Sequence, residues 1–107
     1  MTFYKVNELE KTEAFKGANR SAVYLDGLML TFFEFAPGSI VPEHKHPHEQ
    51  ITLVLEGELE FTLGDETNII KAGEGVTIPS NVPHSARTLS QPTKVLDAWH
   101  PVREDYK

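Results

Sequence analysis

Short apolar runs separated by turn-forming residues limit the folds that this chain can adopt. Turns recur roughly every eight to twelve residues, and glycines such as Gly27, Gly38 and Gly57 lie in them. From Glu58 to Leu63, polar side chains alternate with apolar ones, as on a strand with one face in water. No segment has the apolar spacing of a long helix. The pattern therefore predicts an all-β barrel or sandwich.

The expected strands follow the apolar runs. They cover residues 21–25, 28–35, 51–55, 58–63, 69–70, 76–78 and 94–100. Segment 51–55 is almost continuously apolar, which predicts a strand buried on both faces. Residues 1–20 are mixed and polar. A short helical turn over 8–16, ended by Gly17, is an alternative, but the segment has too few apolar positions for a sound helix, so we expect a lead-in with an edge strand near Tyr4. We expect one domain over residues 1–107, with its core at about 22–100.

Composition and charge restrict the function further. The formal net charge is −6 without a basic cluster, so nucleic acid is not an expected partner. The chain has no cysteine, which excludes disulfides and thiolate metal ligands. No run approaches the ~20 apolar residues that span a bilayer, and the first residues lack the basic and apolar regions of a signal peptide. We therefore expect a cytoplasmic protein that does not bind membranes.

Histidines are concentrated in one short segment. Three of the five lie between residues 44 and 48. On an extended strand His44 and His46, two residues apart, point to the same face, and Gln50 keeps that parity. His84, which follows two prolines, is the best candidate for a further ligand. Three imidazoles and one amide oxygen would suit one divalent transition metal: Zn, Ni, Co, Fe or Mn. A solvated loop is the alternative for a His-x-His pair.

The last expected strand carries a possible catalytic carboxylate. Val95, Asp97 and Trp99 share one face of segment 94–100. If that face is the interior, Asp97 is a carboxylate in an apolar environment beside a large aromatic ring. The alternative is that Asp97 has a structural role, with its charge satisfied by the backbone or by an arginine.

Two spaced motifs resemble those of the cupin superfamily. The first is Gly38-x5-His44-x-His46-x3-Gln50-x6-Gly57. The second is Gly73-x5-Pro79-x-Asn81-x2-His84. The departures are Gln50 where the general motif has Glu, Asn81 where it has Gly, and Thr88 where it has Asn. The resemblance implies a single cupin barrel, which is a small jelly roll or double-stranded β-helix, with a metal inside its mouth.

A closer resemblance is to the small cupins of pectin and alginate breakdown. It rests on the segment His-x-His-Pro-His-Glu-Gln and on the tail from Leu96 to Tyr106. Those proteins convert cyclic 4,5-unsaturated monouronates to the linear keto form, so the resemblance implies an isomerase or lyase type of ring opening on an anionic sugar. The residue correspondences it implies are metal binding by His44, His46, Gln50 and His84, catalysis by Asp97 and Arg103, and substrate binding by Arg103 and Trp99. The family's aromatic residue at position 99 is usually Phe.

Other interpretations remain open at this stage. A neutral Gln50 leaves the metal its full 2+ charge, which favours non-redox chemistry. A cupin dioxygenase or another metal lyase is nevertheless an alternative, as is a non-catalytic cupin that binds a sugar or another small molecule. We expect His48 to lie behind the ligands or at the surface, and we assign no role to Arg20. The apolar strand 28–35 favours a homodimer.

Overall fold

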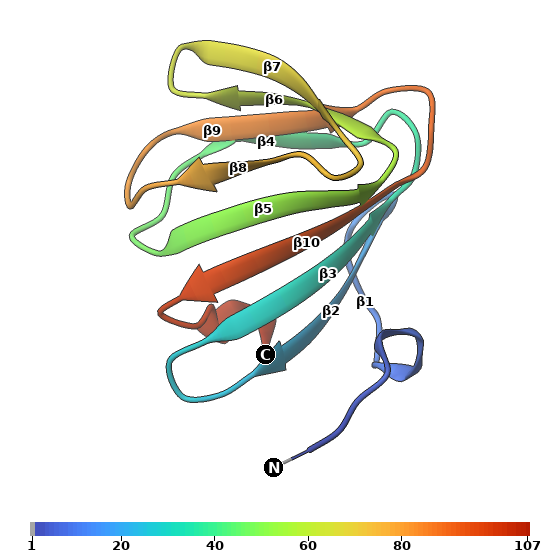
Figure 1. The fold of residues 1–107 in the computed structure, drawn as a ribbon, viewed down its shortest axis with the longest axis vertical. Coiled ribbons are helices and arrows are strands. Elements are labelled where there is room, and N and C mark those ends of the chain that lie inside the picture. The colour runs from blue at the N-terminus through green and yellow to red at the C-terminus, as the bar shows by residue number, and fades with distance from the viewer. Residues whose placement is uncertain (1) are drawn as a thin grey trace.

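The computed structural model describes residues 2–107, so Met1, the first residue of the expected lead-in, lies outside the described residues. Two antiparallel sheets face each other (Figure 1), in the order β1-β2-β3-β10-β5-β8 and β4-β9-β6-β7. The strands are β1 (Thr12–Phe15), β2 (Ala18–Tyr24), β3 (Met29–Phe35), β4 (Ile40–His44), β5 (Glu49–Glu56), β6 (Glu58–Leu63), β7 (Glu66–Lys71), β8 (Gly75–Ile78), β9 (His84–Thr88) and β10 (Thr93–His100). The all-β prediction is therefore confirmed.

The core lies between the two sheets because each sheet turns one row of alternate side chains inward. Along β3 the burial alternates strictly, and the same period holds along β10. The buried cluster between the sheets consists of Ala18, Phe33, Phe35, Val54, Leu59, Phe61, Ile70, Ile78 and Val95. This apolar cluster fixes the register of β5 and β10, and the same inward rows carry the polar residues of the site.

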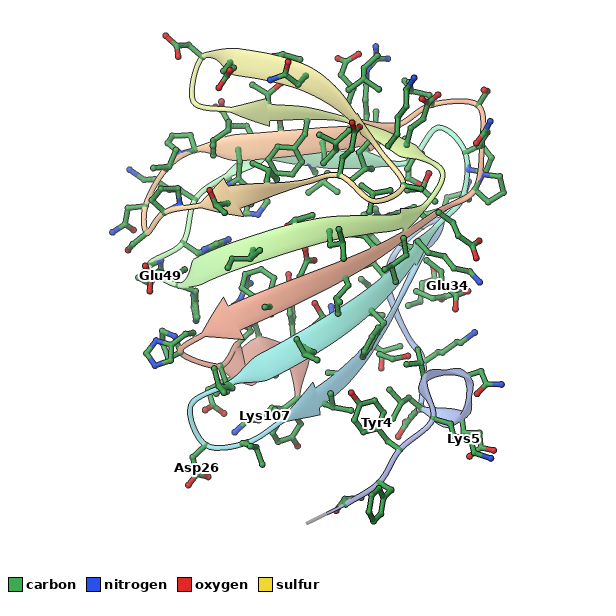
Figure 2. All side chains as sticks on the ribbon, in the orientation of Figure 1. Tyr4, Lys5, Asp26, Glu34, Glu49 and Lys107 are labelled. Carbon is green, nitrogen blue, oxygen red and sulfur yellow. The ribbon has the colours of Figure 1, made fainter. Side chains whose placement is uncertain are left out.

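The expectation that segment 51–55 is buried on both faces is wrong. Gln50, Thr52 and Val54 point inward. The outward side chains of Ile51, Leu53 and Leu55 remain 58%, 37% and 44% exposed. Side chains alternate between the two faces of β5, and among residues 2–107 no segment fully covers its outer face. Figure 2 shows Glu49 at the start of the same strand, where it is also exposed.

The N-terminal expectations also need correction. Residues Thr12–Phe15 form edge strand β1 within the expected lead-in, and the 3-10 helix η1 (Val6–Glu8) precedes it. Tyr4 belongs to no strand. Gly17, with a φ of 87°, turns the chain between β1 and β2. The segment is too polar to form a helix on its own, and pairing with β2 and packing of Phe15 against the core stabilise it as a strand.

The C-terminal residues fold back onto the barrel. They form a 3-10 helix, η2 (Glu104–Tyr106), beyond the end of β10. Tyr106 packs against both buried clusters, including the smaller one of Met29, Trp99 and Val102. The tail is therefore anchored beside the site. Among residues 2–107, no helix has both the length and the apolar character needed to cross a bilayer.

Candidate metal centre

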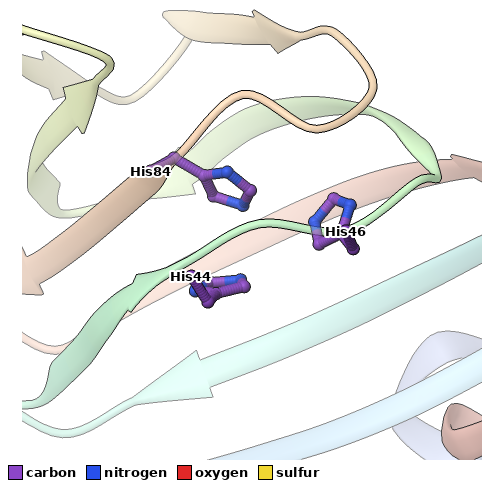
Figure 3. Close-up of side chains that lie close together, drawn as sticks. All are labelled: His44, His46 and His84. Atoms are coloured by element: carbon purple, nitrogen blue, oxygen red, sulfur yellow. The ribbon is translucent and has the colours of Figure 1, made fainter.

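Three histidines from two neighbouring strands and the loop after one of them meet at one end of the barrel. His44 ends β4 and pairs in register with His84 at the start of β9, while His46 lies in the loop that follows β4. One ring nitrogen from each residue lies within 4.8 Å of the others. Figure 3 shows the three rings gathered around a common space. The structure brings together the three histidines named from the sequence, although His46 lies beyond the end of the strand.

Each of these imidazoles has its Nδ1 atom held by a backbone carbonyl. The pairs are His44 with Pro42 O at 2.8 Å, His46 with His48 O at 3.0 Å, and His84 with Val82 O at 2.9 Å. A carbonyl only accepts hydrogen bonds, so Nδ1 carries the proton in each ring and Nε2 carries the lone pair. The Nε2 atom of His84 is buried without a hydrogen-bond partner among the described residues. All three rings therefore have the tautomer that binds a metal through Nε2.

Gln50 supplies a fourth lone pair, from the opposite sheet. Its amide Nε2 donates to Thr52 Oγ1 at 2.9 Å and to Asp97 Oδ1 at 3.2 Å. The amide oxygen consequently faces the Nε2 atom of His46 at 3.1 Å. With Nδ1 of His46 protonated, both atoms present lone pairs to each other, and a cation bound by both would satisfy them. The donor set therefore fits a divalent metal. The sequence argument that Gln50 points to the same face of one strand as His44 was incomplete, because Gln50 lies on β5 and not on the strand of His44.

Burial keeps the two inner histidines in the form that binds metal. His46 and His84 are 7% and 3% exposed. Desolvation is the largest influence on both, and it lowers the pKa of each imidazole below its ordinary value. Since a metal must compete with protons for the same nitrogen lone pairs, neutral rings at pH 7 favour metal binding.

The turn before His84 supports the loop that carries His46. The backbone N–H of Asn81 donates to His46 O at 2.8 Å, and Ser80 Oγ donates to Pro47 O at 2.6 Å. Asn81 has a φ of 63°, in the left-handed region that asparagine tolerates better than most residues. This explains why Asn can replace the Gly of the general cupin motif at this position.

Asp97 points into the barrel, on the face of β10 that it shares with Val95 and Trp99. It is 5% exposed, and its Oδ1 atom accepts hydrogen bonds from Thr52 Oγ1 at 2.6 Å and from Gln50. Burial raises the pKa of the Asp97 carboxyl to about 6, against the opposing effect of these two hydrogen bonds. The hydrogen-bond partners of Asp97 are therefore the side chains of Thr52 and Gln50. The alternative of a structural Asp97 had predicted a backbone or arginine partner.

A cavity of about 250 Å³ opens beside the metal ligands. Its lining includes Gln50, Asp97, Trp99 and two arginines, Arg20 and Arg103. Trp99 is held in place by its Nε1 atom, which donates to Thr31 Oγ1 at 2.9 Å, and its ring centroid lies 5.2 Å from that of His46. The cavity therefore combines a cation site, a buried carboxylate and an aromatic wall, which is a combination suited to a small polar ligand.

Arg103 is already engaged on one edge of its guanidinium group. Its Nε and Nη2 atoms donate to the carboxylate of Asp105 at 3.1 and 2.8 Å, and this hydrogen bonding lowers the pKa of Asp105. Its Nη1 atom is buried and has no hydrogen-bond partner among residues 2–107. A carboxylate in the cavity would therefore meet Nη1, because the edge formed by Nε and Nη2 already binds Asp105.

Tyr106 and Arg20 join this group of side chains, and sequence reasoning assigned neither of them a role. The guanidinium carbons of Arg20 and Arg103 lie 4.1 and 4.2 Å from the centroid of the Tyr106 ring. Burial raises the pKa of the Tyr106 phenol. No local pattern could have shown this stacking, because Arg20 and Tyr106 are at opposite ends of the chain.

The remaining polar residues near the motif play smaller parts. His48 is half-buried and supports His46 through its backbone carbonyl, which agrees with a place behind the ligands. Glu43, Glu49 and His100 are exposed. Thr52 was missed, although its position two residues after Gln50 on a strand placed it on the same inward face.

Comparison with known proteins identifies the family. A family profile described as a cupin domain matches residues 31–99. The chain belongs to the cupin family. It is 33% identical to the pectin degradation protein KdgF of Dickeya dadantii over 82 residues, which cover 76% of this chain and 74% of that one. This cupin also superposes on the structure of KdgF from Halomonas sp. with a TM-score of 0.94 and 27% identity, over 100% of this chain and 99% of that one.

A second relative has a different printed activity. The chain is 38% identical to the dimethylsulfoniopropionate lyase DddQ of Ruegeria pomeroyi over 75 residues, which cover 69% of this cupin but 37% of the lyase. The four candidate ligands and Asp97 all lie within the part of the chain that the cupin profile matches, whereas Arg20 and Arg103 lie outside it. The profile match therefore covers the candidate metal site and does not extend to the two arginines of the cavity.

Proposed function

We propose that this cupin is a metal-dependent enzyme of pectin or alginate breakdown that opens cyclic 4,5-unsaturated monouronates to linear keto uronates. The observation that carries the proposal is the contact between a metal-ligand amide and a buried carboxylate, Gln50 Nε2 to Asp97 Oδ1, in a cavity that also contains arginine. The similarity to KdgF, a protein whose printed name refers to pectin degradation, supports this choice of substrate class.

The reaction needs a proton acceptor and a site for developing negative charge. The substrate is a cyclic hemiacetal whose ring oxygen is bonded to an alkene carbon that bears the carboxylate. Removal of the anomeric hydroxyl proton forms the aldehyde carbonyl as the bond from the anomeric carbon to the ring oxygen breaks. The ring oxygen keeps that electron pair and becomes an enolate. Protonation of the neighbouring vinyl carbon then gives the ketone, and no electrons are gained or lost overall.

Asp97 suits the proton-transfer role. With a pKa of about 6, it is mainly ionised at pH 7 and can still release a proton readily. In the proposed reaction it removes the anomeric hydroxyl proton and returns a proton to the product. Thr52 and Gln50 bind only its Oδ1 atom. The carboxylate is thereby held in a fixed orientation during the reaction.

His44, His46, His84 and Gln50 would hold the metal. Because all four ligands are neutral, a divalent ion would keep its 2+ charge and would supply charge stabilisation to the oxygen that becomes negative. Arg103 Nη1 would bind the substrate carboxylate, and the indole of Trp99 would form one wall of the sugar site. Arg20, which also lines the cavity, is available for a second polar contact with the sugar acid.

The second candidate is a metal-dependent lyase, and the similarity to DddQ is the observation in its favour. A lyase that acts by β-elimination would also need a base such as Asp97 next to a divalent ion. Incubation of the metal-loaded protein with dimethylsulfoniopropionate, followed by measurement of released dimethyl sulfide, tests it. The two candidates differ in substrate and use the same four-ligand site.

Proton NMR with a freshly generated 4,5-unsaturated monouronate tests the ring-opening proposal. We expect the protein to accelerate loss of the vinyl proton signal, a chelator to remove the acceleration, and added divalent metal to restore it. An unchanged spontaneous rate with protein that carries a full equivalent of metal would contradict the proposal.

The cytoplasmic location expected from the sequence stays a prediction.

A further inference from the structure

Thr52 lies where the metal ligands meet the buried carboxylate. It is 3% exposed, faces inward on β5 and pairs in register with Asp97 on β10. We propose that Thr52 is a positioning residue whose hydroxyl fixes which end of the Gln50 amide faces the metal. The inference rests on the metal site of the proposed function, and it concerns metal binding and not turnover.

Proton accounting shows how one hydroxyl can set the orientation of an amide. Thr52 has a single hydroxyl proton, and the 2.6 Å contact directs it to Asp97 Oδ1, which is an acceptor when ionised. Toward Gln50 the hydroxyl therefore presents a lone pair. Only the NH₂ end of the amide can bind it, and that end does so at 2.9 Å. The amide oxygen is consequently directed at His46.

The reversed amide would block the metal site. Turned by 180°, Gln50 would direct its NH₂ group at the lone pair on His46 Nε2 and form a hydrogen bond there without any metal. Its oxygen would then face the lone pair of Thr52 and the carboxylate of Asp97. All of these atoms are hydrogen-bond acceptors, so the contact is unfavourable. The threonine hydroxyl therefore disfavours the orientation that cannot bind metal.

Loss of the hydroxyl should shift the equilibrium between the two orientations. The remaining contact of Gln50 with Asp97 is the longer one, 3.2 Å, and Asp97 itself would lose its shortest hydrogen bond. Since only one orientation binds metal, a smaller population of it weakens the apparent affinity in proportion. Removing groups that orient metal ligands commonly costs ~10- to 100-fold in affinity. We expect a loss of ~10-fold, at the low end, because Asp97 still disfavours the reversed amide.

The test measures metal affinity of the chelator-stripped protein by competition with a chromophoric chelator, using Zn²⁺ or Ni²⁺. Thr52→Val removes the hydroxyl with little change in volume, and Thr52→Ala removes it without requiring space for a second methyl group. Thr52→Ser keeps the hydroxyl. Thr93→Val is the matched control, because Thr93 is a buried threonine whose hydroxyl binds the backbone of Glu58, away from the metal ligands.

The expected result is weaker metal binding by ~10-fold in Thr52→Val and Thr52→Ala, with parental affinity in Thr52→Ser and Thr93→Val. Parental affinity in Thr52→Val or, should Thr52→Val not fold, in Thr52→Ala would overturn the inference and leave the metal site intact. Equal weakening in Thr52→Ser would also overturn it, because the cause would then be packing. A parent protein that binds no divalent metal would overturn both this inference and the site on which it rests.

Discussion

Replacing Asp97 by asparagine should stabilise the metal-free protein at neutral pH while it removes the proposed activity. Asparagine has nearly the shape of aspartate, and its side-chain oxygen can still accept the hydrogen bonds from Thr52 and Gln50. The substitution therefore removes mainly the charge. That charge is costly because the carboxylate is buried and, among residues 2–107, only the neutral side chains of Thr52 and Gln50 donate hydrogen bonds to it.

The size of the effect follows from the pKa of Asp97, which rises from an ordinary 3.8 to about 6 in the folded protein. Each pKa unit corresponds to about 1.4 kcal/mol, so full ionisation costs the fold about 3 kcal/mol. Below pH 3.8 the residue is protonated in both the folded and the unfolded state, and there is no cost. The cost grows as the pH rises from about 4 to 6, because the unfolded state ionises first. Above pH 6 it is fully present.

Urea unfolding of the chelator-treated parent and Asp97→Asn at pH 4 and pH 7.5 measures this difference. We expect the variant to be more stable by up to about 3 kcal/mol at pH 7.5, on the order of 10 °C in Tm, and by little at pH 4. Asp65→Asn, at an exposed turn, is the matched control and should change stability little at either pH. A variant that is no more stable than the parent at pH 7.5, or a difference independent of pH, would refute the reasoning.

Three further predictions concern substrate binding, metal binding and assembly. Arg103→Met should raise KM for the uronate by ~10-fold or more, because a charged hydrogen bond to the substrate carboxylate is lost. Arg87→Met is the control and should leave KM unchanged, because the exposed pair of Arg87 with Glu60 lies outside the cavity. An equal rise of KM in both variants would exclude a specific contact between Arg103 and the substrate. A divalent metal at 100 times its dissociation constant should stabilise the protein by about 2.7 kcal/mol, seen as a higher Tm, and an unchanged Tm would argue against a preformed site. We propose that the uncovered face of β5 pairs with a second copy of the chain, so light scattering should show a dimer that Leu53→Lys converts to monomer; a monomeric parent would contradict this.

The sequence was sufficient to predict the fold class and to name the side chains that meet at the candidate metal centre, because both depend mainly on local spacing. The His-x-His pair, Gln50 and His84 lie in motifs framed by glycine and proline, and alternation placed Asp97 on one face with Val95 and Trp99, which the structure shows to be the inward face. The relation of Gln50 to the other ligands was not local. It depends on a strand in the opposite sheet, which the sequence spacing cannot show.

Long-range contacts account for the features that sequence reasoning missed. Edge strand β1 forms because β2 is available to pair with it, which local polarity did not indicate. Segment 51–55 looked doubly buried because apolar residues occupy both faces, whereas one chain covers only the inner face. Arg20 and Tyr106 are brought together from the two ends of the chain. The pairing of Arg103 with Asp105 is by contrast local, and the sequence spacing alone did not show which carboxylate the guanidinium would bind.

The most direct test of the account is the rate at which the vinyl proton signal of a 4,5-unsaturated monouronate disappears with metal-loaded parent protein and with metal-loaded Asp97→Asn. The account predicts a strong acceleration by the parent and a rate close to the spontaneous one for the variant, with one equivalent of metal bound in both. Loss at the spontaneous rate with the fully metal-loaded parent would contradict ring opening as the function. Full acceleration by Asp97→Asn would contradict the role of the buried carboxylate.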